Sequence, residues 1–288
     1  MKTEVLITGS NGQLGKTVFA LHQGNNYKAL NFTFTTKATL DISNQEQVDR
    51  YFKSNNFNYC INCAAYTAVD RAEDEKEEAF LINAIGARNL AEACKKYGVI
   101  LIHISTDFVF DGSKNEPYSE TDIPNPINVY GASKLQGERN IQSILENYFI
   151  IRTSWLYSEF GNNFVKTMLR LGAEKEELHV VNDQIGSPTY AQDLVEVVLE
   201  IIISGNKKFG LYHFSNKGAI SWFEFAQAVF KLGQISIKLN SIQTKNYPTP
   251  ARRPKNSVLE SSKIETAFKI TTADWKNGLH QVIAKYYE

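Results

Sequence analysis

Tyr130 and Lys134 stand four residues apart in the stretch Tyr130-Gly-Ala-Ser-Lys134. On a helix, residues i and i+4 lie on one face, so this phenol and this ammonium can point into the same cleft. A phenol ordinarily titrates near a pKa of ~10, which is too high for ready proton exchange at neutral pH. A nearby lysine cation favours the phenolate and lowers the pKa of the tyrosine. The pair can therefore move one proton to or from a carbonyl oxygen, although chance also supplies such spacings.

A glycine-rich stretch near the N-terminus predicts a phosphate site. Gly9, Gly12 and Gly15 follow a short apolar run in a G-x-x-G-x-x-G spacing that also contains Gln13 and Leu14. Glycines permit a tight turn and let a pyrophosphate approach backbone amides at the start of a helix, where the helix dipole stabilises it. The strand, loop and helix order favours a dinucleotide site over a glycine-rich surface turn.

The residues after the second predicted strand bear on the choice between NAD and NADP. An acidic side chain there binds the ribose 2′-hydroxyl of NAD and repels a 2′-phosphate. Residues 30–37 contain no carboxylate, but hydroxyls, an amide and Lys37. This composition favours NADP(H), with NAD(H) as the alternative, and places Asp41 beside the adenine.

Two further strand ends contribute polar or small side chains. Residues 62–66 are small up to Tyr66, so ribose and phosphates can pass close by. Residues 103–107 end in Ser105, Thr106 and Asp107. Because neighbouring parallel strands end at one edge of a sheet, Thr106 is expected to hydrogen-bond the carbonyl that Tyr130 protonates. Ordinary turn residues are the alternative interpretation of 105–107.

Alternating apolar runs and helical patterns predict an α/β fold with a Rossmann-like, doubly wound parallel sheet. The expected strands are residues 4–8, 28–35, 59–64, 99–105 and 149–153, and the expected helices are 12–22, 44–53, 75–97 and 133–146. Residues 1–155 therefore form the predicted NADP(H)-binding domain, which also takes in parts of 175–215. Residues 156–288 form mainly a smaller substrate-binding lobe, with helices at 162–171, 193–203, 221–232 and 274–287 and a strand at 210–214.

The composition excludes several classes of protein. The 288 residues include 31 Lys and Arg and 31 Asp and Glu, so the formal net charge is zero and offers no basic surface for nucleic acid or an anionic membrane. The first apolar run is too short for a signal peptide, and the most apolar segment, 194–203, is about half a membrane span. These features predict a soluble, cytoplasmic protein.

The three cysteines are expected to be small buried side chains. Cys60 and Cys63 form a C-x-x-C, which is typical of redox or zinc sites, and Cys94 stands alone. Their run is strand-like, so the two side chains face opposite ways, and no second Cys/His pair has ligand spacing. No metal site is predicted.

Together these motifs resemble the extended short-chain dehydrogenase/reductase superfamily and, in finer detail, its dTDP-4-dehydrorhamnose reductase family. The matching stretches span nearly the whole chain: residues 9–15, 62–70, 105–110, 130–134, 152–155, 161–165, 183–189 and 251–254. The last three lie in the second part of the chain, so the resemblance extends to the substrate side.

The resemblance implies NADPH-dependent reduction of the C4 keto group of dTDP-4-dehydro-L-rhamnose, a nucleotide-sugar step in polysaccharide biosynthesis. Tyr130 would protonate the developing alkoxide, Lys134 would lower the pKa of Tyr130 and hold the nicotinamide ribose, and Thr106 would polarise the carbonyl. Cofactor-binding positions would be Gly9, Gly12, Gln13, Leu14, Gly15, Asp41, Ile42, Ala64, Ala65, Tyr66, Asn83, Tyr130 and Lys134. Substrate-binding positions would be Val69, Thr106, Asp107 and Trp155.

Arg252 and Arg253, in a proline-stiffened loop, suit a substrate diphosphate, with ordinary solvated arginines as the alternative. Two positions depart from the family pattern: Phe108 stands where a tyrosine is usual, and Asn31 where an acidic residue is frequent. The family also allows for a homodimer. Two alternative functions remain: an epimerase or reductase for another nucleotide sugar, and a non-catalytic reductase-like regulatory subunit.

Overall fold

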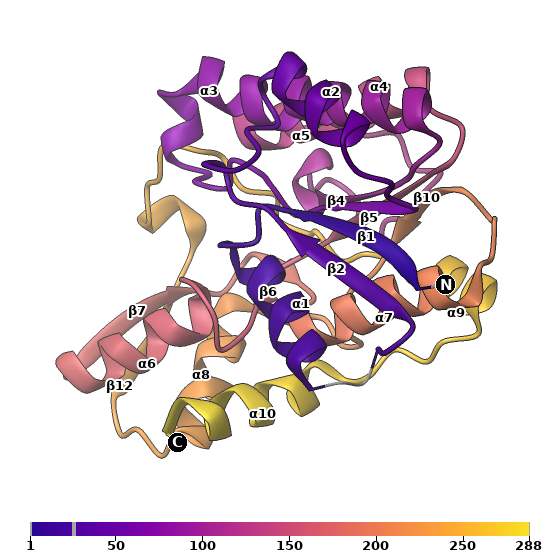
Figure 1. Cartoon of the computed structure of the whole chain (residues 1–288). Coiled ribbons are helices and arrows are strands. Elements are labelled where there is room, and N and C mark those ends of the chain that lie inside the picture. Colours follow the sequence, from indigo (N-terminus) through magenta and orange to yellow (C-terminus); the bar gives the residue numbers. More distant parts are fainter. Residues whose placement is uncertain (1, 25–26, 288) are drawn as a thin grey trace.

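The structure, a computed structural model that describes residues 2–24 and 27–287, is built around a six-stranded parallel sheet (Figure 1). The strand order is β2-β1-β3-β4-β5-β10, and every neighbouring pair is parallel. The strands are β1 (Thr3–Thr8), β2 (Leu30–Phe34), β3 (Tyr59–Asn62), β4 (Ile100–Thr106), β5 (Tyr148–Thr153) and β10 (Gly210–His213). The chain order reverses between β1 and β3, and such switch points are where open parallel sheets bind ligands. The predicted Rossmann-like sheet is confirmed.

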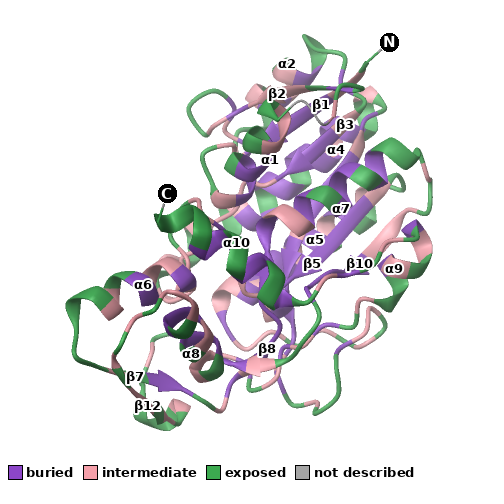
Figure 2. Ribbon diagram, turned by 90° about the horizontal axis from the view of Figure 1, so that it is seen from below, coloured by how far each residue is buried: buried purple, intermediate pink, exposed green. Residues whose placement is uncertain are grey.

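Helices cover both faces of this sheet (Figure 1). One face carries α2 (Gln45–Lys53), α3 (Lys76–Phe80), α4 (Ala87–Tyr97) and α5 (Val129–Ile144), and the other carries α1 (Gln13–Gln23) and α7 (Ala191–Ser204). Two hydrophobic clusters result, one on each face. Figure 2 shows the buried residues gathered on the strands and on α7. The helix α9 (Ser262–Phe268) adds two side chains to the cluster beneath α7, and the sequence did not predict it.

A smaller lobe packs beside the carboxyl edge and has a hydrophobic cluster of its own. Its helices are α6 (Phe164–Glu174), α8 (Trp222–Leu232) and α10 (Trp275–Tyr287). The strands β7 (Glu177–Val181) and β12 (Lys238–Ile242) form a parallel pair that the sequence analysis missed. Short pairs join β6 (Leu156–Tyr157) to β9 (Thr189–Tyr190) and β8 (Ile185–Gly186) to β11 (Ile220–Ser221). The 3-10 turns are η1 (Arg71–Glu73), η3 (Asp107–Val109) and η4 (Thr244–Asn246).

Two predicted helices differ from those observed. The single helix predicted at residues 75–97 is interrupted by a π-helical turn, η2 (Leu81–Gly86), between α3 and α4. The helix predicted to begin at Ser133 begins at Val129, because the Asn128 side chain caps it by accepting a hydrogen bond from the amide of Gly131 at 2.7 Å. Tyr130 therefore lies in the first turn of α5.

A buried ion pair fixes α5 against the sheet. Arg152 on β5 donates to Glu138 on α5 through Nε at 2.9 Å and through Nη2 at 2.6 Å, and both side chains are almost fully buried. The hydroxyl of Ser105 on β4 also donates to Glu138. Glu138 lies one turn after Lys134, so this pair sets the position of the helix that carries the candidate catalytic residues.

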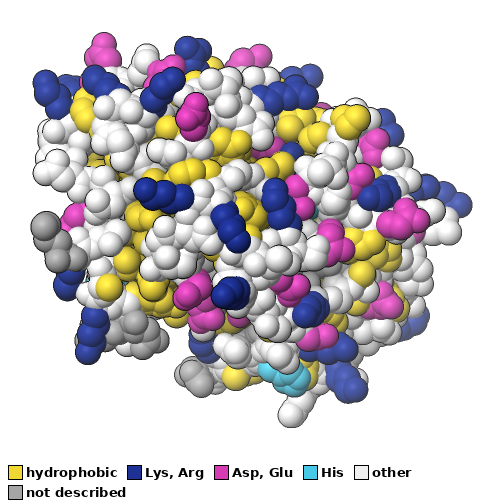
Figure 3. Space-filling model, turned by 90° about the vertical axis from the view of Figure 1, so that its right-hand side faces the viewer, with side chains coloured by type: hydrophobic (Ala, Val, Ile, Leu, Met, Phe, Trp, Pro, Cys, Tyr) yellow, Lys and Arg dark blue, Asp and Glu magenta, His cyan; other side chains and the backbone are white. Residues whose placement is uncertain are grey.

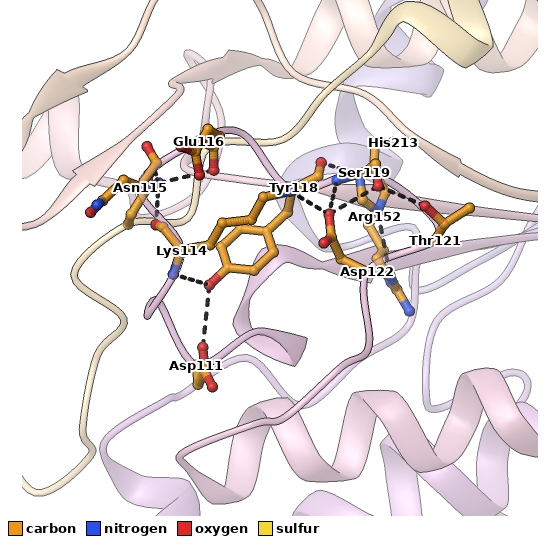
Figure 4. Close-up of polar contacts among 11 residues, drawn as sticks. Asp111, Lys114, Asn115, Glu116, Tyr118, Ser119, Thr121, Asp122, Arg152 and His213 are labelled. Carbon is orange, nitrogen blue, oxygen red and sulfur yellow. Dashed lines mark hydrogen bonds and ion pairs between the residues drawn. The ribbon is translucent and has the colours of Figure 1, made fainter.

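The loop before α5 is anchored to the same network (Figure 4). His213 on β10 donates from Nδ1 to the carbonyl oxygen of Tyr118 at 3.0 Å, and Arg152 donates to His213 Nε2 at 3.3 Å. The Tyr118 hydroxyl donates to Asp111, and the amide of Lys114 donates to that hydroxyl. His103 and His213 are buried, whereas His179 is exposed.

The surface mixes both signs of charge. On the face drawn in Figure 3, lysines and arginines alternate with acidic side chains around stretches of apolar surface. In the described ranges, no helix is both long enough and apolar enough to cross a membrane. The cysteines carry free thiols, with Cys60 and Cys94 buried as expected and Cys63 partly exposed.

The Glu138–Arg152 pair leads to a stability prediction. Replacing Glu138 with glutamine leaves the Arg152 guanidinium buried without a counter-charge, which costs about 3–5 kcal/mol. The exposed pair Arg170–Glu174 on α6 is the matched control, and Glu174→Gln is expected to change stability by less than about 1 kcal/mol. Chemical denaturation measures both. Equal effects of the two substitutions would contradict the structural role of the buried pair.

Candidate active site at the carboxyl edge of the sheet

The glycine loop between β1 and α1 forms a cradle against β3. Gly9 adopts φ +66°, and a Cβ there would lie 2.6 Å from the backbone of Ala64. A Cβ on Gly15 would lie 2.5 Å from the Cα of Ser10. No side chain caps the N-terminus of α1, because the cap residue is Gly12. The first amides of the helix therefore have no side-chain acceptor there and can donate to a ligand. These features fit the pyrophosphate of a dinucleotide.

Thr106 and Tyr130 meet at the ends of β4 and α5. The Thr106 hydroxyl caps η3 by accepting from the amide of Phe108, and it donates to Asp107 at 3.0 Å. Burial raises the pKa of Tyr130 to about 12, while the neighbouring Thr106 hydroxyl acts in the opposite direction. Phe108 packs edge-on against the Tyr130 ring, with centroids 5.6 Å apart. The phenol is therefore kept protonated, as a proton donor requires.

Lys134 is placed differently from the sequence-based expectation. Its Nζ donates to the carbonyl oxygen of Ile104 at 2.7 Å and lies 3.3 Å from His103 Nε2. Burial lowers the pKa of Lys134 to about 8. The expectation that Lys134 lowers the pKa of Tyr130 stays a prediction. In this structure burial raises the pKa of Tyr130, and Lys134 contacts the backbone of β4.

Asp107 is a buried carboxyl beside the reacting groups. Only 2% of its surface is exposed, and its Oδ2 has no hydrogen-bond partner. Burial raises the pKa of Asp107 to about 6, although the hydroxyls of Ser257 and Thr106 favour the charged form. The negative charge of Asp107 in turn raises the pKa of Tyr130. An incompletely satisfied carboxyl at this position is typical of a functional site.

Asn83 holds the loop after β3 rather than pointing into the site. Its Oδ1 accepts from the amide of Tyr66 at 2.9 Å, and its Nδ2 donates to the carbonyl of Tyr66 and to the Ser133 hydroxyl. The Tyr66 hydroxyl donates to Glu75. Asn83 therefore positions the backbone of residues 64–66, the segment against which Gly9 packs.

The other expected cofactor positions lie around the same edge. The Asp41 carboxylate accepts from the amide and hydroxyl of Ser43, and Ile42 is buried behind it. Gln13 faces the lobe, where it donates to the carbonyl of Leu156 and accepts from Asn163. Gln13 would thus reach a dinucleotide through its backbone.

The structure corrects the placement of Asn31. This residue is the second in β2 and donates to Glu4 at the opposite end of the sheet from the glycine loop. The strand ends at Phe34, so the ribose position falls on residues 35–37. Lys37 there is exposed and pairs with Glu78 at 3.3 Å. The absence of a carboxylate at 35–37 is what favours NADP(H).

A cavity of about 520 Å³ lies between the sheet edge and the lobe. Trp155 forms one wall, with φ +46° and its ring stacked on Trp222 at a centroid distance of 3.4 Å. Gly186 makes room for this ring, because a Cβ there would lie 2.4 Å from it. The cavity is lined by Asp70, Phe108, Trp155, Phe164, Thr167, Met168, Leu171, Leu178, His179, Val180, Val181, Gln184, Trp222, Tyr247, Thr249, Arg253, Pro254 and Ser257.

The two expected arginines differ in their surroundings. Arg253 lines the cavity, but its guanidinium donates to both oxygens of Asp70, at 2.9 and 2.7 Å. Arg252 is exposed outside the cavity lining, and its carbonyl accepts from Asn128. Val69 is half-buried next to Asp70. A substrate diphosphate would therefore meet a guanidinium already neutralised by a carboxylate.

Several cavity residues were not nominated from the sequence. Trp222 is not among the expected substrate-binding positions, yet it lines the cavity together with Trp155. Phe164 and Gln184 belong to stretches whose family resemblance was noted, and that was the available signal. Tyr247 and His179 come from segments without any motif, so only the folded structure shows that they line the cavity. Within residues 2–24 and 27–287, no group of three or more Cys, His, Asp or Glu side chains is arranged to hold a metal ion.

The parallel sheet, the glycine cradle at its switch point, and Thr106 beside Tyr130 define a class, the oxidoreductases of the short-chain dehydrogenase/reductase type. Within it, the chain belongs to the RmlD substrate binding domain family, whose model matches residues 1–288. The resemblance inferred from the sequence is confirmed at this level.

Relatives of known name cover the full chain. It is 43% identical to the dTDP-4-dehydrorhamnose reductase of Aggregatibacter actinomycetemcomitans, over 97% of this chain and 98% of the relative. It is 40% identical to the dTDP-4-dehydrorhamnose reductase of Escherichia coli strain K12, over 98% of each. Among solved structures, a dTDP-4-dehydrorhamnose reductase from Bacillus anthracis in complex with NADP matches with a TM-score of 0.94 and 44% identity, covering 99% of this chain and 100% of that one.

The raised pKa of Asp107 predicts a pH-dependent stability. An aspartate in an unfolded chain titrates near ~3.9, so burial of Asp107 costs nothing below that pH. The cost grows as the pH rises from ~3.9 to the folded pKa of about 6 and is constant above it. Asp107→Asn removes this cost and is expected to be more stable than wild type by about 2–3 kcal/mol at pH 8, with no difference near pH 4. Chemical denaturation at several pH values measures it, and a difference independent of pH would exclude the charge as its cause.

Proposed function

We propose that the protein reduces the C4 keto group of dTDP-4-dehydro-L-rhamnose with NADPH, yielding dTDP-L-rhamnose for polysaccharide biosynthesis. The observation that carries this proposal is the position of Tyr130, which lies beside Thr106 and packs against Phe108, a residue that lines the cavity. The full-length relationship to named reductases supports the substrate, and the NADP complex of one of them supports the cofactor.

In this proposal the cofactor, when bound, supplies the hydride, and the residues of the chain do the rest. Gly9, Gly12, Leu14 and Gly15 would hold the pyrophosphate through backbone amides. Residues 64–66, fixed by Asn83, would border the ribose. The Asp41 backbone and Ile42 would flank the adenine.

On the substrate side, Thr106 would hydrogen-bond the carbonyl oxygen that gains negative charge. Tyr130, kept protonated by burial, would donate its phenolic proton to that oxygen. Such a donor, hydrogen-bonded by a hydroxyl and shielded by Phe108, suits proton delivery to an alkoxide. Trp155 and the apolar cavity walls would exclude water from the sugar.

Two alternatives differ in what they require of these residues. A non-catalytic regulatory subunit has no need of a protonated, half-buried tyrosine beside a threonine. Substitution of Tyr130 would therefore leave its regulatory function unchanged. An enzyme for another nucleotide sugar would need Tyr130 but prefer a different substrate. The homodimer, the cytoplasmic location and the division at residue 155 stay predictions that do not depend on this choice.

We expect Tyr130→Phe to lower turnover of dTDP-4-dehydro-L-rhamnose by at least about 100-fold, because the substitution removes only the transferable proton. The loss of absorbance of NADPH in the presence of the sugar measures the rate. Affinity for NADPH, measured by its fluorescence, is expected to stay within about threefold, since the ring and its packing remain.

Tyr51 supplies the matched control. It lies on α2, away from the carboxyl edge, so Tyr51→Phe should leave turnover within about twofold of wild type. A turnover of the Tyr130→Phe variant equal to that of wild type would refute the mechanism. Turnover of other nucleotide sugars but not of dTDP-4-dehydro-L-rhamnose would be consistent with the mechanism and would refute the proposed substrate.

A further inference from the structure

A chain of buried hydrogen bonds runs beneath the candidate site, across the ends of three strands. The Thr8 hydroxyl on β1 donates to Asn62 Oδ1 on β3 at 2.7 Å. Asn62 Nδ2 lies 2.9 Å from His103 Nδ1 on β4, and His103 Nε2 lies 3.3 Å from Lys134 Nζ on α5. All four side chains are buried, so each of their donors needs an acceptor within this series of hydrogen bonds.

The direction of this chain is fixed by one backbone amide. The amide of Ala64 can only donate, and it donates to the terminal atom of Asn62 at 3.1 Å, so that atom is the oxygen. The other terminal atom of Asn62 is therefore the nitrogen, and it donates to His103 Nδ1. A neutral imidazole that accepts at Nδ1 carries its proton on Nε2. Burial lowers the pKa of His103 well below its usual range, so the ring is neutral.

The Nε2 proton of His103 consequently points at Lys134. An ammonium has three donors and no acceptor, so a charged Lys134 would oppose this N–H with another N–H. A neutral amine avoids the conflict, because it can donate to the carbonyl of Ile104 and accept from His103 with its lone pair. Burial acts in the same direction and lowers the pKa of Lys134 to about 8.

The second buried histidine shows the opposite arrangement. His213 donates from Nδ1 to a carbonyl oxygen, that of Tyr118, so its Nε2 is free to accept. That Nε2 faces a cation, and Arg152 donates to it at 3.3 Å. The two histidines are both buried and neutral, yet Nε2 carries the proton in His103 and accepts a hydrogen bond in His213.

We propose that His103 is a positioning residue for Lys134, holding it as a neutral amine against β4 through its Nε2–H. To face Tyr130 as an ammonium, the lysine takes up one proton from solvent and gives up the contact with His103. The contact between His103 and Lys134 does not depend on the proposed reaction. The catalytic importance of positioning Lys134 rests on the proposed reductase function.

Other groups near Lys134 bear on its protonation. Glu138 on the same helix and Cys63 after β3 favour the charged form, and Glu138 is already paired with Arg152. Tyr130 precedes Lys134 by one helical turn. His103 on β4 is the group facing Lys134 that stabilises the neutral amine by hydrogen bonding.

The first test is the tautomer of each histidine in the ligand-free protein. Nitrogen-15 NMR of the imidazole rings is expected to show Nε2–H for His103 and Nδ1–H for His213. Leucine variants of each position assign the signals. An Nδ1–H or doubly protonated His103 near pH 8 would overturn the proposal, and this measurement on wild type requires no variant to fold.

The second test is the titration of Lys134. Proteins labelled with carbon-13 at lysine Cε, with Lys134→Arg for assignment, report the midpoint for this residue. Removing the hydrogen bond in His103→Leu is expected to raise the midpoint by up to about one pH unit. His213→Leu, a matched loss of a buried histidine without contact to Lys134, is expected to leave it unchanged. A midpoint that stays the same or falls in His103→Leu would refute the role, whatever the enzyme's substrate proves to be.

Discussion

The position of α5 is the constraint on which the site depends, and buried polar contacts determine it. Glu138 is paired with Arg152 on β5, Lys134 contacts the carbonyl of Ile104 on β4, and Asn128 caps the first turn. Because each of these groups would be costly to bury alone, the helix has one register in which all are satisfied. Tyr130 lies in the turn between the cap and the lysine. Its phenol is aimed at Thr106 as a consequence of contacts that it does not make itself.

The sequence predicted the fold where the pattern of apolar residues was long and regular. The first five strands and the helices between them agree with expectation within a few residues, because alternating elements permit few arrangements other than a parallel sheet. The lobe was harder. Its β7–β12 pair joins segments some sixty residues apart, with exposed ends and little periodicity, so only tertiary pairing reveals it. The π-helical turn at residues 81–86 likewise arises from packing that a helical pattern does not encode.

For the site, motif spacing predicted which residues converge but not what each one contacts. Tyr130 and Thr106 meet as expected, and the glycine loop packs on residues 63 and 64. The protonation states could not be predicted from the motifs, since they depend on burial and on partners remote in sequence. Lys134 contacts His103 and Ile104 rather than acting on the phenol, and Arg253 is already neutralised by Asp70. A histidine in an apolar run looks like a core residue from sequence, and its tautomer follows only from the amide of Ala64, just after the neighbouring strand β3.

Three features near the carboxyl edge of the sheet are held at a cost in stability. Asp107 keeps an unsatisfied carboxylate oxygen, Lys134 is a base almost removed from water, and Trp155 adopts a left-handed backbone conformation. None improves packing, since an asparagine, an apolar side chain or a glycine would each relieve one of these strains. A chain selected for stability alone would not place them together. Their concentration at one edge of the sheet is typical of a functional site.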